Sequence, residues 1–334
     1  MPIVGVVCVV VFPPWDGILA WMAPLPDTVQ QQVDDAFDHG LDGIIVYVDQ
    51  AGRAPAFYCA GWKDRANQVP ADPLALFKIA SLSKLYIATA AAKLVNDRSL
   101  SLDDTLADHL PELVGRIEYA EQITLRMMLQ HRSGIPNYTD HNEFDWVMPP
   151  SDVSGSLELV LDKLADFKPD ADHHYSNTNF LLIGNILDRV LGYGHQRYIN
   201  EEILTPLGLT HTYGLLNQVD LGDVVSGYHH PYEVDFKEIE YLTPGGSMVA
   251  TAQDVGIFLR ALNDGSLLKG DEQAIYSSIY EYGHKGWVLG YQSIARYHED
   301  IDAVVVQLVN TTGGDSELVT LVAYNRIVKI LGRQ

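Results

Sequence analysis

The chain has 334 residues, of which 44 are acidic and 22 basic, so its formal charge is −22 at neutral pH. This balance argues against nucleic acid and anionic membrane surfaces as partners, because both bind clustered Lys and Arg. Hydrophobic residues make up 47% of the sequence, enough for a large core in one domain or two intimate ones. The two cysteines, Cys8 and Cys59, exclude a disulfide scaffold or zinc ribbon, and the 12 histidines show no metal-binding spacing. We expect no metal and no cofactor.

Residues 1–24 resemble an export signal or a membrane anchor. Ile3 to Phe12 is an unbroken apolar run of ten residues, and Ile18 to Ala23 is apolar again after a Pro-containing break. A helical span takes about 20 residues, so the run is too short to cross a bilayer but suits a signal peptide. Since no Lys or Arg precedes it, a buried Val-rich strand is the alternative. Export would place the protein in the periplasm or outside the cell, and it would otherwise be cytoplasmic. Membrane contact would be limited to this segment.

The next elements indicate a helix, a hairpin and a second helix. Asp27 is placed to cap an amphipathic helix that runs to about Phe37. Strand-like runs at 43–49 and 56–60 flank a turn, which predicts an antiparallel hairpin. Residues 81–95 are rich in Ala and Leu and contain no breaker, which predicts a helix.

Helical and loop signals then continue to about residue 235, and strand character returns late. The predicted helices cover 123–129, 157–164, 179–191 and 316–331, and the late strands cover 287–295 and 303–310. This order predicts an α+β fold in which an antiparallel sheet, flanked by helices, is built from both ends of the chain. We assign about 25–98 and 236–334 to the sheet subdomain of the catalytic unit 25–334. A mostly helical subdomain is inserted over about 99–235.

The first candidate for chemistry is Ser81-Leu82-Ser83-Lys84 at the start of a predicted helix. Three residues make about one helical turn, so the Ser81 hydroxyl and the Lys84 amine lie on one face. A lysine kept neutral by burial or by a cationic neighbour can take the proton of such a hydroxyl. The helix N-terminus adds N–H groups for an oxyanion. A capping serine beside a solvated lysine has the same spacing and is the alternative.

Two further candidates follow along the chain. In Tyr175-Ser176-Asn177 the phenol can relay a proton when its pKa is lowered, and the Asn177 amide can hold a substrate carbonyl. Helix capping is the alternative there. In His284-Lys285-Gly286 the glycine lets a ligand approach a strand that carries two donors. A hairpin entry with two exposed cations is the alternative.

Together, and in this order, the three motifs resemble those of the serine β-lactamases and penicillin-binding proteins. The closest resemblance is to the class C β-lactamase-like and D-Ala-D-Ala carboxypeptidase-like branch, which also includes related esterases. The resemblance runs from about residue 30 to the C-terminus and implies the β-lactamase/transpeptidase-like fold. Matching segments are Phe77–Lys84, Leu100–Asp104, Ile123–Arg126, His131–Pro136, Tyr175–Gly184, Pro206–Gly208 and Pro244–Asp254.

The resemblance implies a role for each matched residue. Ser81 would be the acylated nucleophile, and Lys84 and Tyr175 would share the general-base work. Asn177 would contact the substrate amide, and the backbone N–H groups of Ser81 and Trp287 would form the oxyanion hole. Water would then hydrolyse the acyl-enzyme. The substrate would lie along the strand edge lined by His284, Lys285 and Gly286.

Lys285 departs from the family pattern, which has a small hydroxyl residue at this position. A cation there can bind a substrate carboxylate, and with Lys84 and His284 it predicts a locally basic cleft. The predicted function is a serine hydrolase that forms an acyl-enzyme on Ser81 and cleaves an amide in a β-lactam or a D-Ala-D-Ala peptide. A carboxylesterase on the same scaffold is the alternative. A non-catalytic penicillin-binding or sensor module is the third hypothesis.

Overall fold

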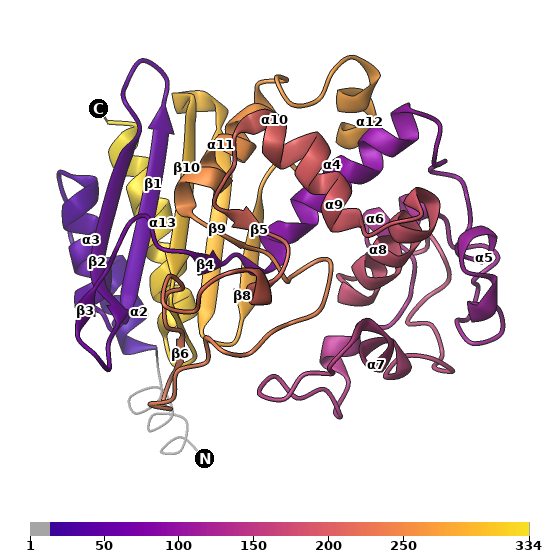
Figure 1. Cartoon of the computed structure of the whole chain (residues 1–334). Coiled ribbons are helices and arrows are strands. Elements are labelled where there is room, and N and C mark those ends of the chain that lie inside the picture. Colours follow the sequence, from indigo (N-terminus) through magenta and orange to yellow (C-terminus); the bar gives the residue numbers. More distant parts are fainter. Residues whose placement is uncertain (1–13, 334) are drawn as a thin grey trace, which may run out of the picture.

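The computed structural model describes residues 14–333, so the apolar run from Ile3 to Phe12 lies outside the described residues. Its largest sheet has six antiparallel strands in the order β3-β2-β1-β10-β9-β8, and the strands come from both ends of the chain (Figure 1). The predicted α+β class, with an antiparallel sheet flanked by helices, is confirmed. The strands are β1 (Gly43–Gln50), β2 (Ala56–Asp64), β3 (Val69–Pro70), β8 (His284–Val288), β9 (Tyr291–His298) and β10 (Ala303–Val309).

Strand β1 explains why helices cover both faces of this sheet. Its side chains alternate between the faces, so Ile45 and Tyr47 join one core while Ile44 and Val46 join the other. Gly256 lies so close to the Tyr47 ring that a Cβ there would overlap it. The first face is covered by α11 (Ala252–Asn263), and the second by α3 (Val29–Asp38) and α13 (Ser316–Leu331), with α2 (Trp15–Met22) packed on α13.

Two predicted boundaries are corrected by the structure. Thr28, rather than Asp27, caps α3, because its side chain accepts the backbone N–H of the third helical residue. The strand predicted over 287–295 is a hairpin, since β8 and β9 are joined by a two-residue turn at 289–290. Gly290 has φ +84°, a left-handed conformation that glycine adopts without steric cost.

The residues between the two parts of the sheet form a helical region. Helix α4 (Ser83–Asn96) starts beside the sheet and runs into this region, which places its N-terminus where the two meet (Figure 1). The helix predicted over 157–164 lies earlier, at α7. The other helices are α5 (Leu106–His109), α6 (Leu125–Leu129), α7 (Val153–Glu158), α8 (Asn177–Leu191), α9 (His195–Ile199), α10 (Thr205–Leu207) and α12 (Asp271–Ile279).

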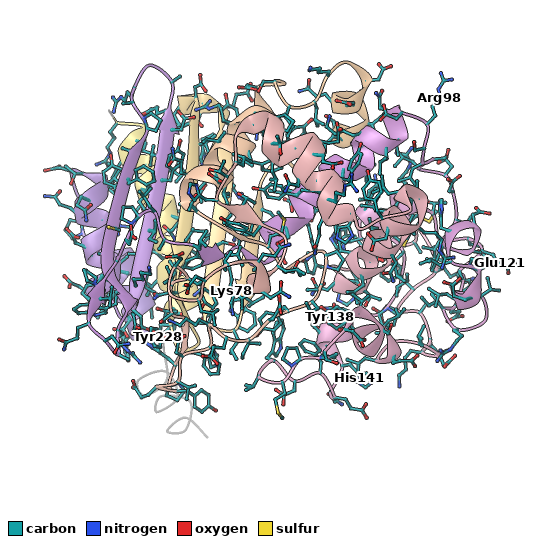
Figure 2. The ribbon with its side chains drawn as sticks, viewed as in Figure 1. Lys78, Arg98, Glu121, Tyr138, His141 and Tyr228 are labelled. Atoms are coloured by element: carbon teal, nitrogen blue, oxygen red, sulfur yellow. The ribbon has the colours of Figure 1, made fainter. Side chains whose placement is uncertain are left out.

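Two small sheets connect the helical region to the large one. Figure 2 shows Lys78 in the interior at this junction, whereas Arg98 and Glu121 point outward at the rim of the helical region. Lys78 lies on one of these short strands, and its amine is buried against the carbonyl oxygens of the loop 236–239 and the Tyr291 ring of β9. The short strands are β4 (Phe77–Lys78), β5 (Thr212–Tyr213), β6 (Tyr228–His229), β7 (Val249–Ala250) and β11 (Thr311–Thr312).

Candidate active site

Ser81 lies in the 3-10 turn Ala80–Leu82 that leads into α4. Ala80, the residue before it, has φ +51°, which is uncommon and strained for a residue with a side chain. The buried hydroxyl of Ser83 holds this turn by donating to the Ala80 carbonyl at 2.7 Å and accepting the Met248 N–H at 3.2 Å. The backbone is therefore fixed in a sharp bend that presents Ser81 at the junction between sheet and helices.

The Lys84 amine is buried next to Ser81 and has three acceptors. Its Nζ lies 3.0 Å from Ser81 Oγ, 2.8 Å from Asn177 Oδ1 and 2.9 Å from the Gly245 carbonyl oxygen. Burial lowers the pKa of Lys84 to about 7, because a charged ammonium is poorly solvated there. A large fraction of Lys84 is thus neutral at physiological pH.

This set of acceptors prepares Lys84 to take a proton from Ser81. A neutral amine has two N–H groups and one lone pair. When the two N–H groups donate to Asn177 and Gly245, the lone pair is left facing the Ser81 hydroxyl. The arrangement therefore has the distances and the protonation state that a general base requires.

Tyr175 contacts the same hydroxyl from a second side. Its phenol donates a hydrogen bond to Ser81 Oγ at 2.8 Å. Burial raises the pKa of Tyr175 well above its usual value of 10, which is opposite to the lowering considered in the sequence analysis. Tyr175 is consequently a protonated donor to Ser81 rather than a phenolate base.

Asn177 is the first residue of α8, and its orientation is set by a loop that the sequence motifs did not identify. Its backbone N–H donates to Asn137 Oδ1 at 2.9 Å, and its Nδ2 donates to Thr139 Oγ1 at 3.2 Å. These bonds direct Oδ1 of Asn177 toward Lys84. The only sequence signal for this loop is its position directly after the matching segment His131–Pro136.

The third motif lies on β8, the edge strand of the large sheet. Val288 and Tyr291 face each other on either side of the two-residue turn. In a hairpin of this kind, the two residues that flank the turn form a hydrogen-bonded pair. Because bonded and non-bonded pairs alternate, the N–H groups of Trp287 and Lys285 point away from β9, outward from the sheet edge. Gly286 packs on the Ser81 turn, where a Cβ would lie only 2.6 Å from the Ile79 carbonyl oxygen. Glycine therefore lets this edge approach the nucleophile.

A cavity of about 560 Å³ joins these elements and extends around the edge of β8. Side chains alternate along the strand, so His284 and Gly286 lie on the Ser81 side and Lys285 on the α13 side. Burial lowers the pKa of His284 to about 4, so it is uncharged at neutral pH. The prediction that His284 contributes a positive charge to a locally basic cleft is therefore wrong. The lining residues are Ser81, Asn137, Thr139, Trp146, Tyr175, Asn177, His284, Lys285, Gly286, Trp287, Gln292, Ser293, Ile294, Glu317, Thr320 and Leu321.

Two tryptophans form an apolar wall of the cavity. The rings of Trp146 and Trp287 are nearly perpendicular, with centroids 5.0 Å apart. Tyr241 donates to the Trp146 carbonyl at 2.9 Å, and the Trp287 indole N–H donates to Glu317 at 3.1 Å. From the sequence, only the backbone of Trp287 is expected in the site. Trp146 is not expected there, because the residues that Trp146 contacts are far away in the sequence.

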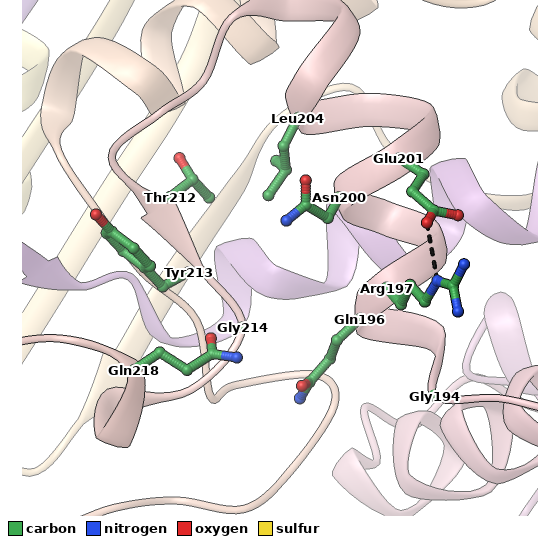
Figure 3. A pocket seen from close by; sticks show the side chains of 10 residues that line it. All are labelled: Gly194, Gln196, Arg197, Asn200, Glu201, Leu204, Thr212, Tyr213, Gly214 and Gln218. Carbon is green, nitrogen blue, oxygen red and sulfur yellow. Dashed lines mark hydrogen bonds and ion pairs between the residues drawn. The ribbon is translucent and has the colours of Figure 1, made fainter.

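A second hollow of about 650 Å³ lies in the helical region (Figure 3). None of the three motifs contributes to it, and its polar lining includes an ion pair of Arg197 with Glu201 at 2.8 Å. Its lining residues are Gly194, Gln196, Arg197, Asn200, Glu201, Leu204, Thr212, Tyr213, Gly214 and Gln218.

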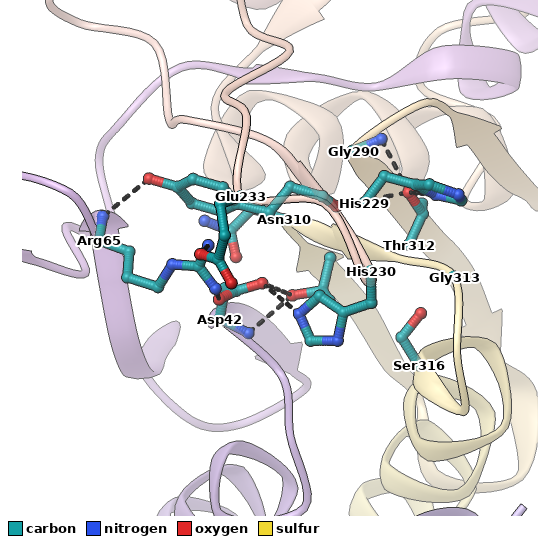
Figure 4. Close-up of polar contacts among 12 residues, drawn as sticks. Asp42, Arg65, His229, His230, Glu233, Gly290, Asn310, Thr312, Gly313 and Ser316 are labelled. Carbon is teal, nitrogen blue, oxygen red and sulfur yellow. Dashed lines mark hydrogen bonds and ion pairs between the residues drawn. The ribbon is translucent and has the colours of Figure 1, made fainter.

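A buried polar cluster beside the large sheet is structural (Figure 4). Asp42 accepts hydrogen bonds from Arg65 at 2.6 Å, from His230 at 3.1 Å and from the Thr311 hydroxyl at 3.1 Å. These bonds tie the start of β1 to β11 and to the loop after β6. Within residues 14–333, no group of three or more His, Cys, Asp or Glu side chains is placed to hold a metal ion.

Comparisons with known proteins identify the family of this chain. A family model described as Beta-lactamase matches residues 25–278. Protein flp of Staphylococcus aureus is 28% identical over 197 residues, which are 56% of this chain and 39% of flp. The chain thus spans about two fifths of the length of this relative.

Two solved structures share the fold. The D-amino acid amidase from Ochrobactrum anthropi SV3 superposes with a TM-score of 0.81 at 23% identity, covering 91% of this chain and 98% of the amidase. A penicillin-binding protein from Bacillus halodurans gives a TM-score of 0.74 at 20% identity, covering 89% and 99%. Identities this low establish the fold alone. The family match over residues 25–278 shows that this chain belongs to the β-lactamase family, within the superfamily of serine β-lactamases and penicillin-binding proteins.

Proposed function

We propose that the protein is a serine hydrolase that forms an acyl-enzyme on Ser81. The observation that carries this proposal is the position of Ser81 Oγ, 3.0 Å from Lys84 Nζ and 2.8 Å from the Tyr175 hydroxyl. One neighbour has a pKa of about 7 and can accept a proton, and the other remains a protonated donor. A non-catalytic binding module needs no such pair around a serine that follows a strained residue, Ala80.

In the proposed reaction, Ser81 Oγ attacks the substrate carbonyl carbon while its proton passes to Lys84. The N–H groups of Ser81 and Trp287 hold the resulting oxyanion. The bond from carbon to the leaving group then breaks, and a proton returns through Lys84 and Tyr175 to the leaving group. A water molecule attacks the acyl-enzyme by the same proton route, which releases the acid and restores Ser81.

The preferred substrate class is an amide, either a D-Ala-D-Ala peptide or a β-lactam. Strand β8 supports this choice, because outward N–H and C=O groups at a sheet edge can pair with an extended peptide. The solved D-amino acid amidase adds amides of D-amino acids to the substrates worth testing.

Ester hydrolysis is the second candidate function. The apolar wall of Trp146 and Trp287 offers contact surface to an acyl chain and needs no peptide ladder on β8. Esters also have a better leaving group than amides, so they place a smaller demand on proton delivery from Tyr175.

Intact-protein mass spectrometry tests the acyl-enzyme directly. We expect a single adduct after incubation with a fluorescent penicillin or an activated ester, and none on Ser81→Ala. No adduct with either reagent, or an equal adduct on Ser81→Ala, would falsify the mechanism.

A comparison of turnover rates then separates the two candidate functions. The panel is a chromogenic cephalosporin, a D-Ala-D-Ala peptide, a D-phenylalanine amide and a short-chain nitrophenyl ester. Turnover of the amides supports the first function, and turnover of the ester alone supports the second.

A further inference from the structure

Helix α2 is an integral part of the folded body. Gly17 faces α13 so closely that a Cβ would overlap the Leu318 side chain, and Ala20 is buried one turn later. Arg326 of α13 donates to the carbonyl of Ala23 at 2.8 Å and to that of Pro24 at 2.5 Å. Removal of the first 24 residues would leave the buried Arg326 without two of its acceptors, which is costly for a charged group.

The opposite side of α2 is apolar and exposed. Trp15, Leu19 and Met22 follow one another at helical spacing and are 47%, 53% and 68% exposed, and Trp21 beside them is 72% exposed. Contacts of α2 with α13 fix this orientation, with Trp15, Leu19 and Met22 on the outer side and Trp21 exposed at its flank. The helix would have to rotate about its own axis to bury these exposed side chains against α13.

We propose that this outer face of α2 rests in the interfacial layer of a phospholipid bilayer. Tryptophan is favoured at that depth, where its ring is half solvated, and a helix with one apolar face lies parallel to the membrane plane. The ten apolar residues from Ile3 to Phe12 precede α2 directly and add to the apolar character of this end.

The proposal specifies an in-plane contact with uncharged lipid. The helix α2 contains Asp16 but no Lys or Arg, and the net charge of the chain is −22, so the proposed contact does not depend on attraction to anionic headgroups. Among residues 14–333, no helix has the length and apolarity needed to span a bilayer. Because α2 is held against α13, residues 15–22 are not available to extend the preceding apolar run into a span.

A second copy of the chain fits the face less well. A stable interface buries about 800 Å² on each partner, which takes roughly 20 residues. The outer face of α2 offers four large side chains, and Asp16 lies within the same helix. A lipid interface needs no such area, because each apolar side chain can insert into the lipid independently of the others.

The test is flotation of the full chain with phosphatidylcholine vesicles. We expect the wild-type protein to float and the Trp21→Ser/Met22→Ser double variant to lose at least tenfold in partitioning. Leu164→Ser is the matched control, because Leu164 is an 83% exposed apolar residue in the helical region, and it should float as wild type. Both changed sites are exposed, and far-UV circular dichroism checks that the variants are folded.

Four results would overturn the proposal. The wild-type protein would fail to float, or the double variant would float equally well. Alternatively, sedimentation without vesicles would show a wild-type dimer that the double variant loses, which would identify a second copy as the occupant. In cells, an intact mass that begins after Pro24 would also contradict it, since α2 would then be absent from the mature protein.

Discussion

Two buried lysines, Lys78 and Lys84, differ in what surrounds them. Burial lowers the pKa of both Lys78 and Lys84 to about 7. Lys78 donates to the carbonyl oxygens of Phe236 at 3.1 Å and Ile239 at 2.6 Å, and its Nζ lies 5.0 Å from the centre of the Tyr291 ring. Its partners accept hydrogen bonds but carry no proton that can be moved.

Lys84 has the same protonation equilibrium but a different set of partners. One of its three acceptors, the Ser81 hydroxyl, also carries a proton that a neutral amine can accept. Desolvation alone therefore lowers the pKa of a buried lysine toward neutrality, while the neighbouring hydroxyl is what the proposed general-base role of Lys84 requires. A lowered lysine pKa by itself therefore does not locate an active site.

Substitution of the two lysines should separate these roles with the largest effect. Lys84→Met should lower the rate of Ser81 acylation by about 10²–10⁴-fold, the usual contribution of a general base. Lys78→Met should leave that rate, expressed per folded molecule, within about a factor of three. Stopped-flow acylation by an activated ester measures both. Equal losses in the two variants would show that the difference in partners has no catalytic meaning.

The pH dependence of acylation should report Lys84 alone. The neutral amine is the active form, so kcat/KM should rise about tenfold per pH unit below pH 7 and level off above it. His284, whose pKa is about 4, should not set this midpoint. A pH–rate profile of wild type and His284→Asn checks the assignment. A midpoint that moves in His284→Asn, or one near pH 4, would contradict it.

Stability should depend on pH through Lys78 as well as Lys84. The folded pKa of about 7 lies below the unfolded value, so the unfolded state binds more protons between the two pKa values. The free energy of unfolding should thus rise with pH in this window, by about 1.4 kcal/mol per unit for each lysine. Urea denaturation between about pH 7.5 and 9.5 should give a smaller slope for Lys78→Met. The exposed Lys163→Met is the control and should keep the wild-type slope.

Lys285, the exposed lysine of the cleft, should show the smallest effect. Its side chain lies on the α13 side of β8, and an exposed ion pair is worth about 0.2–1 kcal/mol. Lys285→Thr should therefore raise KM for a carboxylate-bearing substrate by roughly two- to fivefold and leave KM for a neutral ester unchanged. Steady-state kinetics with both substrates decides this. An equal change for both would remove carboxylate binding as its role.

The sequence by itself determined the pieces of the fold that depend on local periodicity. The strand-like apolar run at 43–49, the Ala-rich run after Ser81 and the amphipathic pattern of 316–331 each predict an element that the structure contains. The turn at 289–290 was not predicted, because Gly290 lies inside an otherwise strand-like run. Motif spacing also identified the chemical groups of the candidate site, since Ser81 and Lys84 lie one helical turn apart.

Tertiary structure decided everything that depends on partners distant in the chain. The Gly245 carbonyl and Asn177, which come from separate loops, leave the lone pair of a neutral Lys84 facing Ser81. Burial, which no local pattern reports, lowers the pKa of His284 and raises that of Tyr175. The packing of Gly17 on α13 likewise makes α2 part of the folded body. Residue types and their spacing are local properties of a sequence, whereas desolvation and hydrogen-bond geometry arise only when distant segments meet.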